Sequence, residues 1–269
     1  MIKCDNWPTG VCSWSASDNL ETLGQLRSEL GLEHLHLHAV PAIGSEGDKF
    51  LRAIKEQGWQ VTCTMVSFEQ EDYSTLDAIK RTGGIVPDES WDENRQRVLR
   101  SIDVTADLGV QLLSFHLGFI DMEDEAYRTK LSERILLLAD AAKAKGVRLL
   151  LETGQESASE LRAFLESLNH DSLGVNFDPA NMLLYDKGDP VEAVKTLGGL
   201  IEHVHIKDAL AAQWGKETPW GDGDVDTQAF LTALKEIGYD GALAIERECG
   251  KSRFEDVKKA IDRLVKFQA

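Results

Sequence analysis

The sequence predicts an α/β protein in which eight parallel strands, each followed by a helix, close into a (β/α)8 TIM barrel. Strand-like and helix-like segments alternate along the whole chain of 269 residues, and the strand-like segments number eight. No glycine-rich dinucleotide-binding pattern follows the first of them. A doubly wound open sheet is the alternative, because it is built from the same alternation. No linker or low-complexity segment divides the chain, so we expect one domain over residues 1–269.

The expected strands are short runs of apolar, often β-branched residues, and each leads through a loop into a helical pattern. In chain order they are Val11–Ser15, His34–Val40, Gln60–Phe68, Gln111–Leu117, Val147–Glu152, Leu173–Phe177, His203–Lys207 and Ala242–Glu246. The long segment Glu69–Trp91 follows the third strand and would lie on the catalytic side of a barrel. It fits a lid over a substrate, and a plain surface excursion is the alternative.

The expected helices carry apolar residues at three-to-four spacing and have recognisable ends. The helix over Glu123–Lys145 stops before Gly146, a suitable residue just beyond a helix C-cap. Ser157 and Glu160 have the spacing of a capping box at the start of the next helix. Asp226 can cap a later helix in the same way. These signals support the alternation of strand and helix in the second half of the chain.

The charge balance of the chain is strongly acidic. Lys plus Arg number 29 and Asp plus Glu number 46, which gives a formal net charge of −17. Such a surface repels nucleic-acid backbones and anionic membranes, so we expect neither as a partner. A small-molecule substrate fits better, and a homo-oligomer is compatible with the sequence.

The cysteines and the N-terminus indicate a reducing compartment. The four cysteines show no CxxC spacing, so we expect free thiols. The start, MIKCDNWPTG, has no basic region followed by an apolar run, and no apolar stretch approaches the ~20 residues that span a bilayer. We therefore expect a cytoplasmic protein.

Four side chains at the ends of successive strands are the strongest functional signal. They are Glu152 in LLLETG, Asp178 in VNFDPAN, His205 in HVHIKDA and Glu246 in ALAIERE. In a parallel barrel such residues converge on one pocket, where three carboxylates repel one another unless a cation is present. The set suits Mn²⁺ first, with Mg²⁺, Co²⁺ or Zn²⁺ as alternatives. Any one carboxylate alone could instead be a helix cap or an ion-pair partner.

The two histidines of the predicted seventh strand are expected to have different roles. His203, His205 and Lys207 share one face of the strand, because side chains alternate between faces. His205 lies level with the other ligands, whereas His203 sits one pleat deeper and is expected to support the site through hydrogen bonds. Lys207 lies one pleat further out, where its ammonium could contact a substrate or remain a solvated loop lysine.

Further residues are expected to border the substrate. His116 ends the fourth strand, Asn181 follows Asp178 by three residues, and Trp14 ends the first strand, where it could form an apolar wall or pack in the barrel. In HLHLH, His38 is expected near the pocket, while the other two histidines fill barrel layers. The turn TPWGDGDVD could cradle a phosphate at the following helix, but its acidic residues favour a role in shaping the loop.

At these residues the chain resembles the xylose isomerase-like superfamily, in particular its sugar phosphate isomerase/epimerase group, which includes the ketose 3-epimerases. The pieces that carry the resemblance are LLLET, GVNFDPAN, EHVHIKD, GDGDVD and ALAIERE, in this order and spacing. The resemblance implies a TIM barrel and a metal held by Glu152, Asp178, His205 and Glu246. It also implies that the metal stabilises an enediolate while Glu152 and Glu246 act as the acid–base pair.

The chain departs from the ketose 3-epimerases at two places. These enzymes typically have a His where Asn181 stands, and an Arg beyond the strand-seven His, near Lys207. The metal chemistry is unaffected, but a free ketohexose is no longer the expected substrate. The main expectation is a metal-dependent isomerase or epimerase of a sugar, sugar phosphate or polyol. The alternatives are a dehydratase or lyase on a keto-polyol, as in inositol catabolism, and an endonuclease IV-like DNA repair enzyme, for which His38 and His116 supply only part of the extra ligands.

Overall fold

The computed structural model describes residues 2–121, 123–211, 214 and 216–267. It contains a closed barrel of eight parallel strands, as predicted, rather than an open sheet. The strands are β2 (Trp7–Cys12), β3 (His34–His38), β4 (Gln60–Met65), β5 (Leu112–Phe115), β6 (Arg148–Glu152), β7 (Leu173–Phe177), β8 (Ile201–Ile206) and β11 (Leu243–Ile245). Closure comes from parallel pairing of the last of these, β11, with the first, β2.

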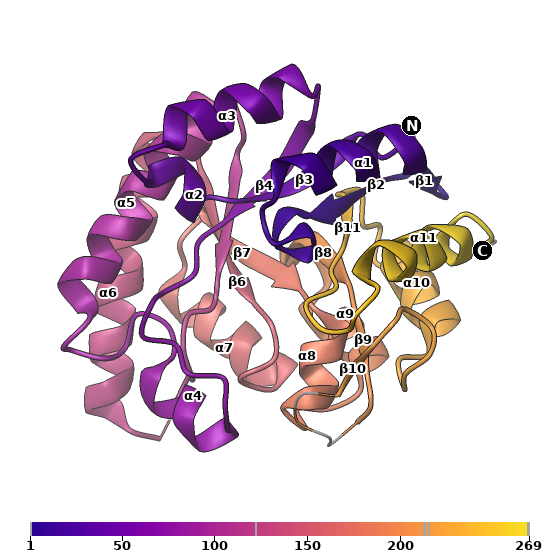
Figure 1. Ribbon diagram of the computed structural model, residues 1–269. Coiled ribbons are helices and arrows are strands. Elements are labelled where there is room, and N and C mark those ends of the chain that lie inside the picture. Colours follow the sequence, from indigo (N-terminus) through magenta and orange to yellow (C-terminus); the bar gives the residue numbers. More distant parts are fainter. Residues whose placement is uncertain (1, 122, 212–213, 215, 268–269) are drawn as a thin grey trace.

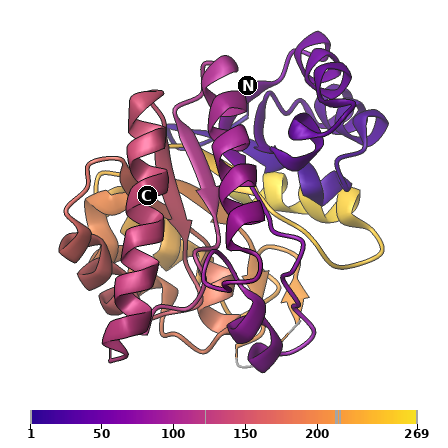
Figure 2. The same ribbon diagram turned by 90° about the vertical axis from the view of Figure 1, so that its left-hand side faces the viewer.

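Helices surround the strands on the outside of the barrel (Figure 1). The longer ones are α1 (Leu20–Leu30), α3 (Gly47–Glu56), α5 (Trp91–Asp107), α6 (Glu125–Ala144), α7 (Ala158–Leu168), α9 (Pro190–Leu197), α10 (Thr227–Glu236) and α11 (Arg253–Leu264). Figure 2 shows α5 and α6 running side by side along the strands. None of the described helices is long and apolar enough to cross a membrane.

Several short helices and strands lie in the segments that connect or precede the barrel elements. They are β1 (Lys3–Cys4), η1 (Ser13–Ala16), α2 (Val40–Ile43), α4 (Leu76–Thr82), α8 (Pro179–Leu184), η2 (Gly198–Leu200), β9 (Asp208–Ala209) and β10 (Glu217–Thr218). Of these, α4, α8, β9 and β10 gather at one end of the barrel, at the bottom of both views (Figures 1 and 2). The first two belong to loops that follow β4 and β7, so this end is the carboxyl end of the strands.

The core has an apolar shell and a polar interior, and β3 shows both. Leu35 and Leu37 are fully buried in the apolar cluster between strands and helices. His36 points the other way and contacts Ser114 and His205 across the barrel. The HLHLH pattern therefore places its histidines on one face, as its alternation predicts.

The helix ends follow the sequence signals. The capping box of α7 is complete, because the Ser157 side chain accepts from the backbone of Glu160 and the Glu160 side chain accepts from the backbone of Ser157. Asp226 caps α10 through the N–H of Ala229. After α6, Gly146 adopts a φ of 72°, which the absence of a side chain permits.

The first barrel strand differs from the prediction of Val11–Ser15. It begins and ends earlier, as β2, and the 3-10 helix η1 follows it directly. The side chain of Ser13 donates a hydrogen bond of 2.6 Å to Asp18, and Ser17 takes up a left-handed conformation with a φ of 54°. These local bonds turn the chain away from the sheet although its apolar residues suit a strand.

Candidate active site

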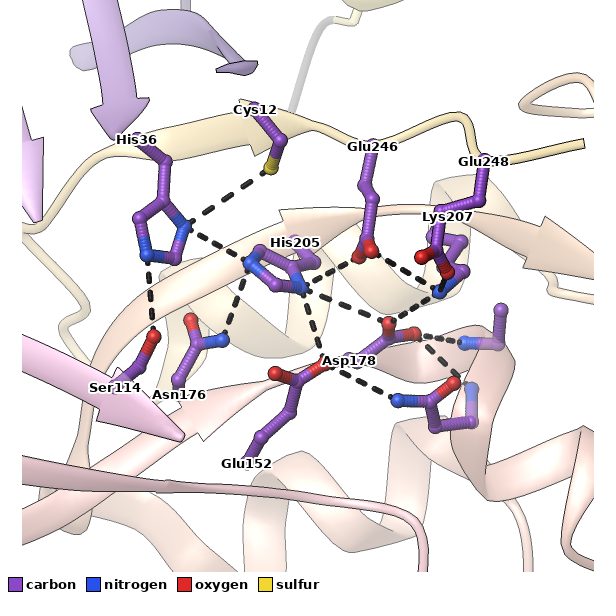
Figure 3. A network of polar contacts seen from close by, with 12 residues as sticks. Cys12, His36, Ser114, Glu152, Asn176, Asp178, His205, Lys207, Glu246 and Glu248 are labelled. Carbon is purple, nitrogen blue, oxygen red and sulfur yellow. Dashed lines mark hydrogen bonds and ion pairs between the residues drawn. The ribbon is translucent and has the colours of Figure 1, made fainter. Parts of the chain in front are cut away.

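One ligand atom from each of four side chains comes together at the carboxyl end of the barrel (Figure 3). The four atoms lie within 4.8 Å of one another and belong to the residues that the sequence singled out, Glu152, Asp178, His205 and Glu246. Glu152 ends β6, Asp178 follows β7 and caps α8, His205 lies in β8, and Glu246 follows β11. All four are at most 5% exposed.

His205 stands at the centre of the three carboxylates. Its Nδ1 lies 2.7 Å from Oε2 of Glu246, 3.3 Å from Oε1 of Glu152 and 3.6 Å from Oδ2 of Asp178. Burial opposes a charge on this imidazole, but the surrounding carboxylates still raise the pKa of His205 well above its usual value. The pocket is therefore strongly anionic and favours a cation at its centre.

Each of these four side chains carries one atom without a hydrogen-bond partner. The atoms are Oε2 of Glu152, Oδ2 of Asp178, Nδ1 of His205 and Oε2 of Glu246. Buried polar atoms in folded proteins are almost always satisfied, so the three of these atoms that face one another, on Asp178, His205 and Glu246, indicate a missing partner. Three carboxylate oxygens and one imidazole nitrogen form a donor set that fits Mn²⁺, Mg²⁺, Co²⁺ or Zn²⁺.

The remaining oxygens of the carboxylates are held by neighbours. The indole N–H of Trp14 donates to Oε1 of Glu246 over 2.8 Å. The amide of Asn181 donates to Oε1 of Glu152 over 3.1 Å. Oδ1 of Asp178 accepts from two backbone N–H groups in the first turn of α8. Asp178 and Glu246 thus keep one oxygen fixed and turn the other toward Nδ1 of His205, whereas Glu152 presents the same oxygen, Oε1, to both Asn181 and His205.

Charged neighbours distinguish the two glutamates. Burial opposes ionisation of both, but Lys207 and His205 together hold the pKa of Glu246 well below its usual value. For Glu152, burial is outweighed by the imidazoles of His116 and His205, which lower its pKa. The pKa of Asp178 shifts the other way. Burial raises it by more than the nearby ammonium of Lys207 lowers it.

Lys207 is buried and held by carboxylates. Its Nζ lies 2.7 Å from Glu248, 3.2 Å from Oε1 of Glu246 and 3.6 Å from Asp178 (Figure 3). Only 5% of its side chain is exposed, so it is not a solvated loop lysine. Its ammonium reaches the same side of the pocket as Glu246.

The deeper histidines support His205 from below. His203 is fully buried, and its Nδ1 lies 2.9 Å from Oδ1 of Asn176. On its other side, Nε2 of His205 lies 3.1 Å from Nδ2 of Asn176 and 3.0 Å from Nδ1 of His36. The deeper position of His203 matches the expectation, whereas the contact of His36 with His205 was not anticipated.

The centre opens into a cavity of about 530 Å³. All five residues expected near the substrate line it: Trp14, His38, His116, Asn181 and Lys207. Both ring nitrogens of His38 are engaged, with Asp18 at 2.8 Å and Ser67 at 3.0 Å, so they are not free to bind a metal.

The cavity also has lining residues that the sequence did not reveal. They are mostly aromatic and acidic: Phe68, Glu71, Tyr73, Tyr185, Trp214, Glu217 and Glu248. Phe68, Glu71 and Tyr73 belong to or adjoin the segment Glu69–Trp91, whose expected position on the catalytic side was the one available signal. The others come from loops that become neighbours only when the barrel closes.

The segment Glu69–Trp91 is fixed in place over the cavity. A carboxylate oxygen of Glu71 accepts the N–H of Gly84 over 3.0 Å, and the carbonyl of Gly84 accepts from Gln70 and Asn94. Gly84 has a φ of 66°, and a Cβ there would collide with the backbone of Leu117. The segment is therefore an anchored cover rather than a loose excursion.

Comparisons with known proteins agree with this geometry. A family described as xylose isomerase-like TIM barrel matches residues 24–267. The crystal structure of a xylose isomerase domain protein from Planctomyces limnophilus is 33% identical, with a TM-score of 0.86 over 96% of this chain and 95% of that chain.

Two curated relatives are more distant. The inosose dehydratase of Lacticaseibacillus casei is 26% identical over 48% of this chain and 49% of its own length. The ketose 3-epimerase of Arthrobacter globiformis is 25% identical over 55% of this chain and 53% of its own length. The match thus spans about half of each relative. The family match over most of the chain, the closed barrel and the 33% identical structure together establish that the protein belongs to the xylose isomerase-like TIM barrel family.

Proposed function

We propose that this protein is a metal-dependent isomerase or epimerase of a sugar or related polyol, with Glu152 and Glu246 as the proton-transferring residues. The observation that carries the proposal is the buried cluster of Glu152, Asp178, His205 and Glu246, whose last member lines a cavity large enough for a monosaccharide. A divalent cation, Mn²⁺ first among the candidates, would there stabilise the negative charge that develops on the substrate oxygens.

The two glutamates approach the cavity from different parts of the barrel. Glu152 belongs to β6 and Glu246 follows β11, and two strands, β7 and β8, separate them in the sheet. One glutamate, as a carboxylate, can therefore remove a proton from the carbon next to a carbonyl, while the other takes up a proton from solvent and returns it to the opposite face of that carbon. This exchange inverts the carbon and conserves the composition of the substrate.

Neighbouring groups set the state of each glutamate. The indole of Trp14 and the ammonium of Lys207 stabilise Glu246 as a carboxylate, ready to accept a proton. Asn181 and His116 do the same for Glu152, the imidazole from 3.7 Å. Lys207 and His116 can also donate hydrogen bonds to substrate oxygens, because both line the cavity.

A dehydratase acting on a keto-polyol is the second candidate. The similarity to an inosose dehydratase favours it. The same proton removal would then be followed by loss of a hydroxyl group from the neighbouring carbon, with the ammonium of Lys207 or the imidazole of His116 able to protonate the leaving oxygen.

Product mass separates the two candidates. The purified protein is loaded in turn with Mn²⁺, Mg²⁺, Co²⁺ and Zn²⁺ and incubated with a panel of ketoses and inososes. Epimerisation gives a product of unchanged mass that chiral chromatography resolves, whereas dehydration removes one water. Absence of turnover with every metal, together with absence of metal binding, would contradict both candidates.

A further inference from the structure

The loop after β8 contains a cradle of backbone N–H groups, and a carboxylate of the chain already fills it. Asp208 accepts hydrogen bonds from the backbone of Ala209 at 2.8 Å, Gly221 at 2.8 Å, Gly223 at 3.0 Å and Val225 at 3.1 Å. In TIM barrels the loops after the seventh and eighth strands frequently bind a substrate phosphate through such groups. Here β8 is the seventh barrel strand, and Asp208 occupies the place of the anion.

The fit of Asp208 in this cradle depends on a glycine. Any Cβ at Gly223 would collide with the Asp208 carboxylate and with the side chain of Thr218. Asp208 is fully buried, so a phosphate that displaced it would leave the Asp208 carboxylate buried without its four N–H partners. The loop that could have bound a phosphate is thus closed by the chain itself.

Among the residues that the structure describes, the cavity lining offers no free cation for a phosphate. Among the described residues that line it, Lys207 is the one lysine or arginine, and three carboxylates already lie within 3.6 Å of its ammonium. The nearby Arg247 is not among the lining residues, since its guanidinium pairs with Glu217 at 2.6 Å and Asp256 at 2.9 Å.

The cavity wall is acidic and aromatic. Glu71, Glu217 and Glu248 line it in addition to Glu246 of the central cluster. A divalent cation offsets part of this charge but leaves the wall unfavourable for a dianionic phosphate ester. The rings of Phe68, Tyr73, Tyr185, Trp214 and Trp14 supply flat apolar surface for the C–H groups of a polyol.

From these observations we infer that the site selects an uncharged ketose or polyol and rejects its phosphate ester. This inference rests on the proposed function and narrows it. It attributes the selection to two features: Asp208, which fills the N–H cradle, and Glu248, which pairs with the cavity lysine.

The test compares D-fructose and D-ribulose with their terminal phosphate monoesters on the metal-loaded protein. We expect kcat/KM for the free ketose to exceed that for the ester by at least ~10-fold, because the ester adds like charges beside the carboxylates. The variant Glu248→Gln removes the shortest of the three ion pairs of Lys207 and one negative charge from the wall, and should narrow this ratio by improving turnover of the ester. Glu236→Gln removes the same charge at an exposed position on α10 and should leave the ratio unchanged.

Ligand-induced thermal stabilisation provides a second readout that does not require turnover. The free ketoses should raise the melting temperature of the metal-loaded protein more than their esters do. A larger effect of an ester, or faster turnover of it, overturns the inference while leaving the isomerase proposal in place. A protein that neither binds nor converts either class contradicts the proposed function and the inference with it.

Discussion

Nδ1 of His36 lies 3.0 Å from Nε2 of His205, and both rings are fully buried beneath the carboxylate centre. Nδ1 of His205 faces the three carboxylates, so it is the nitrogen available to a metal, and with a metal bound there Nε2 would carry the proton. That N–H points to His36, whose own Nε2 lies 3.1 Å from the hydroxyl of Ser114 (Figure 3). In that state His36 would accept the hydrogen bond from Nε2 and hold the ring of His205 in its orientation.

The first prediction follows from this contact. His36→Phe keeps a ring in the barrel but removes the acceptor for the His205 N–H. We expect metal affinity to fall by ~10–100-fold, as is usual when the partner of a metal-binding histidine is lost. Competition with a chelator measures the affinity. His34→Phe is the control, because His34 lies on the same face of β3 but outside the site, and equal affinity of the two variants would contradict the role of His36.

The sequence showed which way the histidines of β3 point, but not what His36 contacts. The alternation of HLHLH places all three on one face, and this was confirmed. The contact between His36 and His205 joins residues 169 positions apart. It depends on how far strands on opposite sides of the barrel are staggered, which no local pattern reports.

The second prediction concerns Glu152. In the wild type, a metal at 100 times its dissociation constant should stabilise the protein by ~2.7 kcal/mol. Glu152→Gln removes one charged ligand, so we expect affinity to fall at least ~10-fold and this stabilisation to fall by about 1.4 kcal/mol. Calorimetric melting with and without metal measures it, and the exposed Glu236→Gln serves as control. Full occupancy and full stabilisation in Glu152→Gln would argue against this ligand.

The third prediction separates the two histidines of β8. His205→Ala should abolish most of the metal affinity, because the ring faces the carboxylates at distances of 2.7–3.6 Å. His203→Ala should have a smaller effect, since His203 reaches His205 only indirectly, through Asn176 and through the ring of His36. Isothermal titration with Mn²⁺ compares the two variants. Equal losses would mean that His203 takes part in metal binding.

The eightfold alternation and the strand-end residues were readable from the sequence because each depends on a local pattern. The end of the first strand was not, since the segment Val11–Ser15 contains no residue that breaks strands and leaves the sheet at Ser13, whose side chain bonds to Asp18. The acidic wall of the cavity was equally hidden. Glu71 and Glu217 come from loops 146 residues apart (217 − 71) and meet only around the cavity.

The fourth prediction concerns pH and a carboxyl group outside the site. Burial raises the pKa of Glu156 to about 8, against a value of 4.5 for a free side chain. The folded protein therefore keeps a proton that the unfolded chain loses above about pH 4.5. Stability should fall as pH rises through this window, by about 1.4 kcal/mol per pH unit from this group, and should level off above pH 8.

Glu156→Gln tests this effect directly. Its amide remains neutral, so the variant should lack this part of the pH dependence and should be more stable than the wild type at pH 8. Urea unfolding of the metal-free proteins at about pH 5 and about pH 8 gives the two slopes. Glu133→Gln, an exposed change on α6, is the control. Parallel slopes for Glu156→Gln and the wild type would show that Glu156 is ionised in the folded state.

The last prediction tests proton transfer by the two glutamates once a substrate has been identified. Turnover in D₂O should place deuterium on the carbon beside the carbonyl, because the returning proton comes from a carboxyl group that exchanges with solvent. Glu152→Gln and Glu246→Gln should each lower kcat by at least ~10²-fold.

Both glutamates are also expected metal ligands, so the loss of rate must be separated from a loss of metal. The variants are therefore assayed at saturating Mn²⁺, with occupancy measured in the same samples. Asn181→Ala is a useful comparison, because it frees Oε1 of Glu152 from its 3.1 Å hydrogen bond without removing a carboxylate. It should reduce the rate less than Glu152→Gln.

Product without deuterium does not decide whether the glutamates transfer the proton, since a shielded group can return the same proton. Near-normal turnover in both fully metal-loaded Gln variants would decide against the acid–base role of Glu152 and Glu246, because a carboxamide cannot accept the proton.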